Sequence, residues 1–255
     1  MTLTLTTVPC LADNYAFIIG NPATKEAAVI DVPQAAPINA AILAGGWHLT
    51  TVLLTHHHWD HIDGLDGLTN SADLHIIGAA ADAHRLPALR TAVAEGDTIH
   101  VCGEDAQILD VSGHTVGHIA YHFAQSGFAF TADSLMALGC GRLFEGTPAQ
   151  MWESMQKLRA LPPETLICSG HEYAASNAAF ALTLEPDNAD LRSRVETIKT
   201  ARLNSEPTVP STLAVEQQTN PFLRADVPAL KHAIGMDNAD STTVYAEIRA
   251  RKDRF

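Results

Sequence analysis

Short apolar runs alternate with turn residues along the first two thirds of the chain. Gly, Asp and Asn separate the runs, whose lengths are typical of strands. Strands are predicted at residues 3–8, 16–19, 27–30, 51–54, 74–77, 108–111, 120–123, 128–131 and 166–168. Helices are predicted at 34–44 and 148–161, and Thr147-Pro148 gives the second an N-cap and a proline at its first position. Many strands with few intervening helices favour an α/β sandwich over a regular βαβ array.

After about residue 172 the pattern becomes helical. Helices are predicted at residues 174–184, 190–203, 227–234 and 242–252, with a proline-containing loop at 206–210. A first domain of residues 1–172 is therefore expected to precede a smaller all-helical domain of residues 173–255. No Gly-x-Gly-x-x-Gly follows the first strand, which argues against a dinucleotide-binding fold.

Composition and charge exclude several classes of protein. The chain has 255 residues, of which 46% are hydrophobic and 18% charged, as in a globular protein with a core. Its net charge of -13 argues against a nucleic-acid partner, and an anionic ligand would need a local basic pocket. We expect a cytoplasmic protein without membrane contact, because there is no signal-peptide pattern, spanning segment or Cys-x-x-Cys pair. A monomer is expected as well, although nothing in the sequence fixes the oligomeric state. The cysteines are Cys10, Cys102, Cys140 and Cys168.

Metal-binding residue types are concentrated directly after one predicted strand. Residues 56–63 contain four histidines and two aspartates. His56 and His58 are two apart, so in an extended chain they point to the same side, and Asp60 and His61 follow at once. Imidazole and carboxylate groups suit zinc, iron or manganese. A polyhistidine surface patch is the alternative to a metal site.

Three further predicted strands are followed by similar side chains. The segments are Val111-Ser-Gly-His114-Thr-Val-Gly-His118, Phe130-Thr-Ala-Asp133 and Ile167-Cys-Ser-Gly-His171. A single histidine in such a place is more often a structural residue. Strands that end at one edge of a sheet would gather all four groups, and the repeated coincidence favours a metal site over a surface patch.

These motifs resemble the metallo-β-lactamase superfamily. The resemblance rests on Thr55-His-His-His-Trp-Asp-His61, Gly113-His-Thr-Val-Gly-His118, Asp133 and Gly170-His-Glu-Tyr173. Within that superfamily, two further segments resemble glyoxalase II, the hydroxyacylglutathione hydrolases. They are Gly139-Cys-Gly-Arg-Leu-Phe-Glu-Gly-Thr147 and the C-terminal Arg249-Ala-Arg-Lys-Asp-Arg-Phe255.

The resemblance implies an αββα fold with two divalent metal ions, zinc being expected and iron or manganese being alternatives. One ion would be held by His56, His58 and His114, the other by Asp60, His61 and His171, and Asp133 would bridge them. His57 occupies a variable position and is not an expected ligand. His118 and Asp31 are expected to support or pack against ligands. The family usually has glycine before the bridging aspartate; the methyl group of Ala132 is expected to be tolerated there, and crowding of the site is the alternative.

The same resemblance implies hydrolysis of S-(2-hydroxyacyl)glutathione thioesters, chiefly S-D-lactoylglutathione, to glutathione and D-lactate in methylglyoxal degradation. Substrate contacts would come from Arg142, Phe144, Tyr173, Arg249 and Lys252. The three cationic residues would supply positive charge that the acidic chain lacks overall. Phe144 replaces a second tyrosine of the family, as in some bacterial members, so one hydroxyl contact would be missing. The alternative for the C-terminal cations is a solvated basic helix end that the helix dipole favours.

The implied chemistry needs no dedicated general base. Two metal ions sharing one water lower its pKa towards ~7, and this hydroxide would attack the thioester carbonyl. Asp60 and Asp133 are assigned as catalytic carboxylates. The leaving thiol has a pKa near ~8.5 and can depart as a thiolate, so no strong acid is required. A serine hydrolase is disfavoured, because the chain lacks Gly-x-Ser-x-Gly.

Other functions remain as alternatives at this point. The same scaffold could carry a persulfide dioxygenase, a lactonase or a β-lactamase. A dioxygenase would use a single iron, so metal count and oxygen uptake separate it from the hydrolase, and the helical C-terminal domain with its basic end argues against it. A non-catalytic, metal-stabilised binding protein could lose ligands harmlessly, whereas here every expected ligand position is filled.

Overall fold

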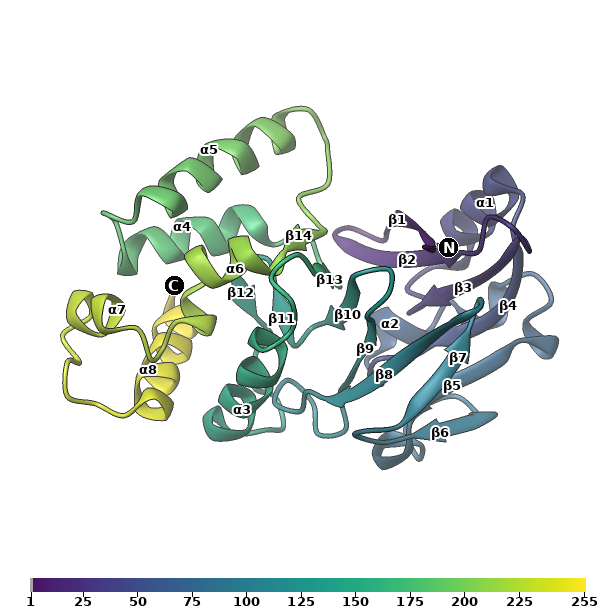
Figure 1. Ribbon diagram of the computed structural model, residues 1–255, viewed down its shortest axis with the longest axis horizontal. Helices are drawn as coiled ribbons and strands as arrows, with labels where there is room; N and C mark the ends of the chain where they lie inside the picture. Colours follow the sequence, from purple (N-terminus) through teal and green to yellow (C-terminus); the bar gives the residue numbers. More distant parts are fainter. Residues whose placement is uncertain (1) are drawn as a thin grey trace. The chain divides into compact units, whose positions relative to one another are not determined.

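The computed structural model describes residues 2–255, which form two compact units (Figure 1). The N-terminal unit comprises residues 2–110 and Val116–Ala132, and the C-terminal unit comprises Val111–Thr115 and Asp133–Phe255. These units do not follow the predicted boundary after residue 172, which stays a prediction.

Most elements of the N-terminal unit are strands. The strands are β1 (Thr4–Cys10), β2 (Asn14–Gly20), β3 (Glu26–Ile30), β4 (His48–Leu53), β5 (His75–Ala79), β6 (Thr91–Val93), β7 (Thr98–Val101), β8 (Glu104–Asp110), β9 (Ile119–Phe123) and β10 (Phe128–Ala132). The helices are α1 (Ala35–Gly45) and α2 (Trp59–Ile62), with short 3-10 helices η1 (Leu65–Gly67), η2 (Ser71–Asp73) and η3 (Ala80–Asp82). One sheet has the order β1-β2-β3-β4-β5-β6, antiparallel from β1 to β3 and parallel from β3 to β6. Strands β7, β8, β9 and β10 pair consecutively and antiparallel.

Alternate residues of β2 belong to two different packing layers. Ile18 lies in a cluster with Ile38 of α1, on one face of the first sheet. Phe17, its neighbour, points to the other face, where its ring lies 5.7 Å from that of Phe130 in β10. Because strand side chains alternate between faces, the N-terminal unit is layered as helix, sheet and sheet.

The buried hydroxyl of Tyr121 links the two sheets of this unit. It donates to the carbonyl oxygens of Leu54 and Ile77 at 2.8 and 3.2 Å. Burial raises the pKa of Tyr121 well above its usual value, so the hydroxyl stays a donor. This bond ties Leu54, directly after β4, to strand β9 of the second sheet.

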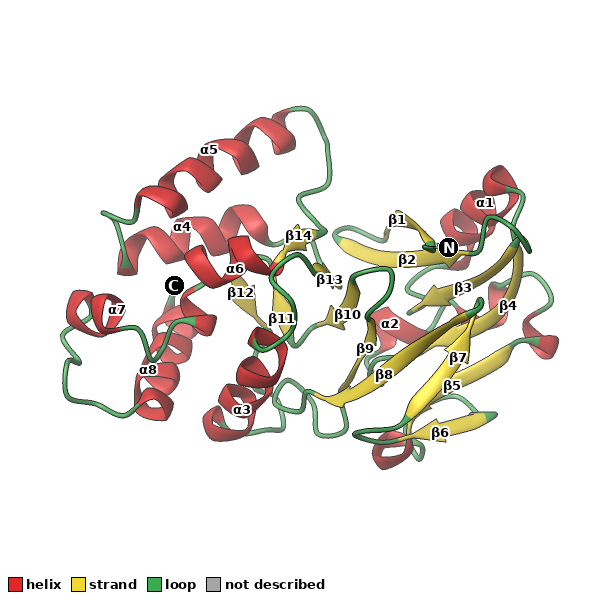
Figure 2. Cartoon of the chain, in the orientation of Figure 1, coloured by secondary structure: helices red, strands yellow, loops and turns green. Residues whose placement is uncertain are grey.

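The C-terminal unit is mainly helical (Figure 2). Its helices are α3 (Pro148–Arg159), α4 (Ala174–Leu184), α5 (Ala189–Leu203), α6 (Leu213–Thr219), α7 (Pro228–Ala233) and α8 (Ser241–Arg254), with the 3-10 helix η4 (Pro221–Leu223). Its strands are β11 (Leu135–Met136), β12 (Gly139–Cys140), β13 (Leu166–Ser169) and β14 (Ser211–Thr212). Because β14 pairs antiparallel with β13, the expectation that residues 173–255 are all helical misses one two-residue strand. None of the helices described combines the length and hydrophobicity of a membrane span.

The predicted start of α3 is confirmed in atomic detail. Thr147 Oγ1 accepts from the backbone N–H of Gln150 at 3.2 Å, and the Gln150 side chain accepts from the N–H of Thr147 at 2.9 Å. This reciprocal pair is a capping box, and Pro148 occupies the first helical position. The helix begins where these local interactions require it to begin, and its buried face packs against α8.

Candidate metal centre and binding pocket

In the N-terminal unit, the parallel strands β3 and β4 end at the same edge of their sheet. Asp31 follows β3 and Thr55 follows β4 closely, and both the N–H and the hydroxyl of Thr55 donate to the Asp31 carboxylate at 2.8 Å. His61 Nδ1 donates to the same carboxylate at 2.8 Å. This bond fixes the ring and directs Nε2 of His61 away from Asp31 as the ligand atom, which is the supporting role expected of Asp31.

The next histidine is oriented through the same threonine. Since the Thr55 hydroxyl donates to Asp31, it accepts from His56 Nδ1, which lies 3.0 Å away. His56 Nε2 is then the ligand atom, and it lies 3.1 Å from Nδ1 of His58. Ligands of a tetrahedral zinc ion with bonds of about 2.0–2.1 Å lie about 3.3–3.4 Å apart, so this pair suits one metal ion.

The short helix α2 carries the remaining two predicted ligands of this unit. Asp60 Oδ2 lies 4.0 Å from His61 Nε2 and accepts a hydrogen bond of 3.1 Å from the Asn14 side chain. His57 instead binds the fully buried Asp82 at 2.8 Å. The ring of His118 stacks on that of His56 at 4.6 Å. These contacts agree with the expectation that neither His57 nor His118 is a ligand, which stays a prediction.

In the C-terminal unit one carboxylate lies beside two imidazoles. Asp133 Oδ2 is 3.5 Å from His114 Nε2 and 3.3 Å from His171 Nε2. Both separations match two ligands on a shared metal ion. His114 Nδ1 donates to the carbonyl oxygen of Arg142 at 2.8 Å, which again presents Nε2 as the ligand atom. The donor set and its spacing therefore fit divalent metal ions in both units.

All five predicted substrate residues line one pocket of the C-terminal unit, and so do two predicted metal ligands. The pocket has a volume of about 510 Å³. Its lining includes His114, Asp133, Cys140, Arg142, Phe144, Tyr173, Ser176, Asn177, Arg249, Lys252 and Phe255. Cys140, Ser176, Asn177 and Phe255 were not predicted as site residues from the sequence. Ser176 and Asn177 follow Tyr173 within one helical turn, which is the signal that could have drawn attention to them.

Arg249 is much less available than a solvated helix end would be. Arg249 is only 5% exposed. Its guanidinium donates to the Cys140 carbonyl oxygen at 3.1 Å and to the Asp253 carboxylate at 2.8 Å. The guanidinium also lies 5.2 Å from the ring of Phe222. The alternative of a solvated basic helix end is therefore wrong for Arg249, which holds β12 against α8.

Lys252 is the more adaptable cation of the pocket. Its ammonium group lies 3.3 Å from both the carbonyl oxygen and the hydroxyl of Ser176, and about 5 Å from the rings of Phe180 and Phe255. Burial, followed by the positive charges of Arg249 and Arg142, lowers the pKa of Lys252 to about 8. An anionic ligand would relieve this unfavourable environment.

Aromatic rings accompany both imidazoles of this unit. The ring of Phe144 lies edge-on to His114 at 5.3 Å, and that of Tyr173 stacks on His171 at 4.7 Å with an interplanar angle of 6°. Phe144 is 64% exposed and Tyr173 is 38% exposed. The pocket therefore combines cations and ligand-type groups with accessible aromatic surface.

Comparison with known proteins identifies the family. A model of the metallo-beta-lactamase superfamily matches residues 14–171, and a model of the hydroxyacylglutathione hydrolase C-terminus matches residues 172–255. The chain is 62% identical to a hydroxyacylglutathione hydrolase of Jannaschia sp. (strain CCS1), over 98% of this chain and 97% of that protein. The chain belongs to the hydroxyacylglutathione hydrolase family. A relative of the same name in Ruegeria pomeroyi is 57% identical over the full length of both proteins.

Solved structures confirm the fold class. The match to the crystal structure of ETHE1 from Myxococcus xanthus covers 99% of this chain and 98% of the ETHE1 chain, with a TM-score of 0.65 at 22% sequence identity. The match to TTHA1623, solved in a di-iron-bound form, covers 86% of this chain and 99% of the TTHA1623 chain, with a TM-score of 0.61 at 22% sequence identity. The chain thus has the metallo-beta-lactamase fold followed by the helical region typical of hydroxyacylglutathione hydrolases.

Proposed function

We propose that the protein hydrolyses S-(2-hydroxyacyl)glutathione thioesters, with S-D-lactoylglutathione as its chief substrate, and releases glutathione and D-lactate. The observation that carries the proposal is the pocket of the C-terminal unit. It joins the imidazole of His114 and the carboxylate of Asp133 to Arg142 and Lys252 around one cavity. Such a pocket suits a ligand with a carbonyl to be activated at one end and carboxylates at the other.

We propose two divalent metal ions as cofactors, zinc in the first place and iron or manganese as alternatives. The proposed ligands of one ion are His56, His58 and His114, those of the other are Asp60, His61 and His171, and Asp133 bridges. Support comes from family membership and from the ligand spacings within each unit. The contact of Asp133 with one histidine from each proposed set is what a bridging carboxylate requires.

When bound, such ions lower the pKa of a water molecule and polarise a carbonyl group. The residues of the chain then have to bind and orient the thioester. Lys252 and Arg142 attract the glutathione carboxylates, while Tyr173 and Phe144, whose rings lie beside His171 and His114, orient the thioester. The departing thiolate needs no acid from the chain, since thiols ionise near pH ~8.5. Asp60 and Asp133 would act as catalytic carboxylates by holding the metal ions.

We also propose where the protein works and in what oligomeric state. A cytoplasmic monomer is consistent with cysteines that show no paired spacing and with a small-molecule substrate that needs no protein partner.

Elemental analysis combined with an assay on S-D-lactoylglutathione tests the proposal. The purified protein should contain two metal equivalents and release D-lactate and glutathione in equal amounts. Glutathione persulfide with an oxygen electrode is the control reaction. One iron per chain together with oxygen uptake would overturn the proposal in favour of a dioxygenase.

A further inference from the structure

A two-stranded hairpin in the C-terminal unit connects two parts of the proposed site. Strands β11 and β12 pair antiparallel, with Asp133 just before the first and Arg142 just after the second. The N–H of Gly141 donates to the Ser134 carbonyl oxygen at 3.2 Å and closes the base of the hairpin. Any shift of the hairpin would therefore move Asp133 and Arg142 together, including the carbonyl oxygen that accepts from His114.

Every residue from 136 to 140 uses one backbone polar group to bind a buried side chain. Asn220 Nδ2 donates to the carbonyl oxygens of Met136 and Gly139, at 3.0 Å each. Asn177 Nδ2 donates to Ala137 O at 3.0 Å, Glu216 Oε2 accepts from Leu138 N at 2.9 Å, and Arg249 donates to Cys140 O at 3.1 Å. We call these four side chains, Asn177, Glu216, Asn220 and Arg249, the hairpin clamp.

The clamp is buried and linked within itself. Glu216 and Asn220 are fully buried, and Asn220 Nδ2 also lies 3.2 Å from Glu216 Oε2. The other oxygen of Glu216 accepts from Arg194 and from Ser211, at 2.5 Å in the latter case. A buried carboxylate with this many donors is held in one place, because each lost partner would leave an uncompensated charge or dipole.

The clamp also holds the hairpin in a conformation that its own residues disfavour. Leu138, in the turn, has a φ of 56°, in the left-handed region where a residue with a side chain is unfavourable. Gly139 lies so close to Asn177 that a Cβ atom there would come within 2.4 Å of its amide nitrogen. The side chains of α4, α6 and α8, together with Asn220 directly after α6, thus impose the hairpin geometry, since the conformation of Leu138 is not one that its own residue type favours.

We propose that Asn220 and its clamp partners are positioning residues for the metal centre, and that they act by fixing the hairpin which carries Asp133 and the backbone acceptor of His114. The expected effect of the clamp on kcat rests on the proposed function, whereas its expected effect on metal content does not. It gives the C-terminal helices a role in metal binding beyond substrate contacts. Supporting groups around metal ligands commonly change metal affinity or activity about tenfold to a hundredfold.

Asn220→Ala and Asn177→Ala, each as full-length purified protein, test the clamp. After loading with zinc and gel filtration, both variants should retain about one metal equivalent fewer than the wild type. Their kcat on S-D-lactoylglutathione should fall roughly tenfold to a hundredfold. If Asn220→Ala fails to fold, the milder Asn177→Ala, which removes one clamp bond, decides the question alone.

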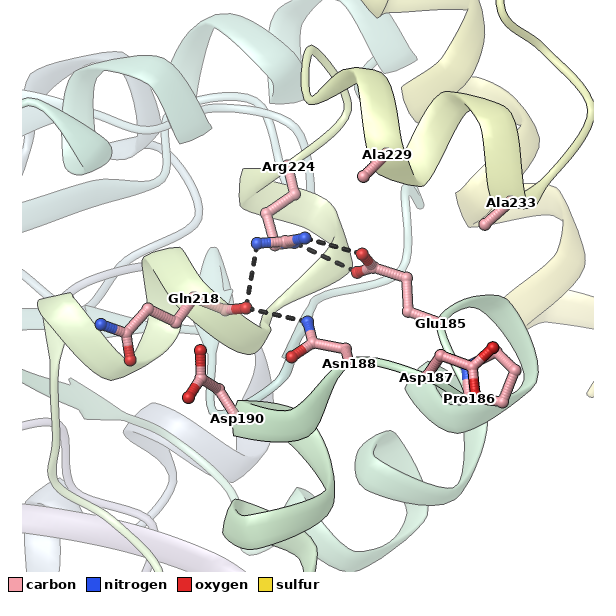
Figure 3. A pocket seen from close by; sticks show the side chains of 9 residues that line it. All are labelled: Glu185, Pro186, Asp187, Asn188, Asp190, Gln218, Arg224, Ala229 and Ala233. Atoms are coloured by element: carbon pink, nitrogen blue, oxygen red, sulfur yellow. Dashed lines mark hydrogen bonds and ion pairs between the residues drawn. The ribbon is translucent and has the colours of Figure 1, made fainter.

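Asn188→Ala is the matched control. Asn188 caps α5 through Leu191 N at 3.1 Å and donates to Gln218 O at 3.1 Å, at a separate pocket in which Arg224 is already bound to Glu185 (Figure 3). This variant should lower the melting temperature and leave metal content and kcat unchanged. Clamp variants that match it, with full metal content and normal kcat at a similar melting temperature, would show a purely structural role and overturn the proposal. A wild-type protein with two metal ions but no thioesterase activity would refute the proposed function, while the metal measurements still decide the clamp.

Discussion

Replacing Lys252 with methionine removes the ammonium group of the pocket and keeps most of the apolar stem. In the free protein the ammonium touches only Ser176 and two aromatic rings among the contacts described, so its loss should disturb the fold little. A charge-assisted hydrogen bond to a glutathione carboxylate contributes roughly 1.5–3 kcal/mol. Since ~1.4 kcal/mol corresponds to a factor of ten, KM for S-D-lactoylglutathione should rise about tenfold to a hundredfold.

The kcat should change little, because this contact is far from the reacting carbonyl and is made equally in ground and transition states. Steady-state kinetics on S-D-lactoylglutathione and on a small thioester without the glutathione moiety measure the effect. The small thioester should be hydrolysed at the wild-type rate, and metal content should be unchanged. Equal losses on both substrates, or an unchanged KM for the glutathione ester, would refute the reasoning.

The pH dependence gives an independent check on the same residue. The pKa of Lys252 is lowered to about 8, so the ammonium is fully present below that pH and is lost above it. KM for the glutathione ester should therefore rise with pH above about 8 in the wild type and stay flatter in Lys252→Met. The free energy of unfolding, in contrast to substrate binding, should improve as the pH rises. The unfolded chain holds the proton up to its ordinary pKa of 10.5, so this residue's contribution to stability increases between about pH 8 and 10.5.

Four further changes test other parts of the site. Asp133→Ala should leave the fold largely intact but remove most activity and at least one metal equivalent, and a variant with both metals and near-normal turnover would contradict the bridging assignment. Gly141→Ala should abolish metal binding, because a Cβ there would lie 2.0 Å from the Asp133 carbonyl oxygen. Gly96→Ala meets no atom within 4 Å but has a φ of 84°, so it is a control for backbone strain away from the site and should keep its metal content. Ala132→Gly should change the free energy of unfolding by no more than about 1 kcal/mol, since relief of a φ of 39° offsets the greater freedom of glycine in the unfolded chain; a larger loss in chemical denaturation would argue against this balance. Arg249→Met should lower the free energy of unfolding by roughly 1.5–3 kcal/mol, because a buried guanidinium with two acceptors is lost, and a clean KM effect without destabilisation would return it to a substrate role alone.

The sequence predicted the regular elements well where the signal was local. Each of the nine predicted strands overlaps an observed one, and the start of α3 was predictable from Thr147-Pro148 because a capping box involves neighbours only. The strands that were not predicted are β6, β7, β11, β12 and β14, and they are two to four residues long. Pairing with other segments stabilises such strands, and no periodicity is visible over so few positions.

The predicted site residues of each unit lie near one another, yet their environments could not be predicted. Nothing in the spacing of Arg249 and Lys252 indicates that one is buried against β12 while the other remains adaptable. The hairpin clamp could not be predicted from the sequence either, because Glu216 and Asn220 bind backbone groups 78 to 84 residues away in the chain. Contacts of this kind depend on how helices pack, which a single sequence specifies only indirectly.

The cations around the pocket bear on how an acidic protein would bind the proposed anionic substrate. Burial is the largest cause of the lowered pKa of Lys252, and the positive charges of Arg249 and Arg142 add to it, so three cationic residues line this pocket despite the net charge of -13. A cluster of like charges of this kind favours a bound carboxylate. A bound carboxylate would in turn raise the pKa of Lys252, so substrate binding above about pH 8 should be accompanied by proton uptake. Lys252, unlike Arg249, therefore acts less as a stabilising group of the fold than as an unfavourably placed charge that a bound carboxylate would relieve.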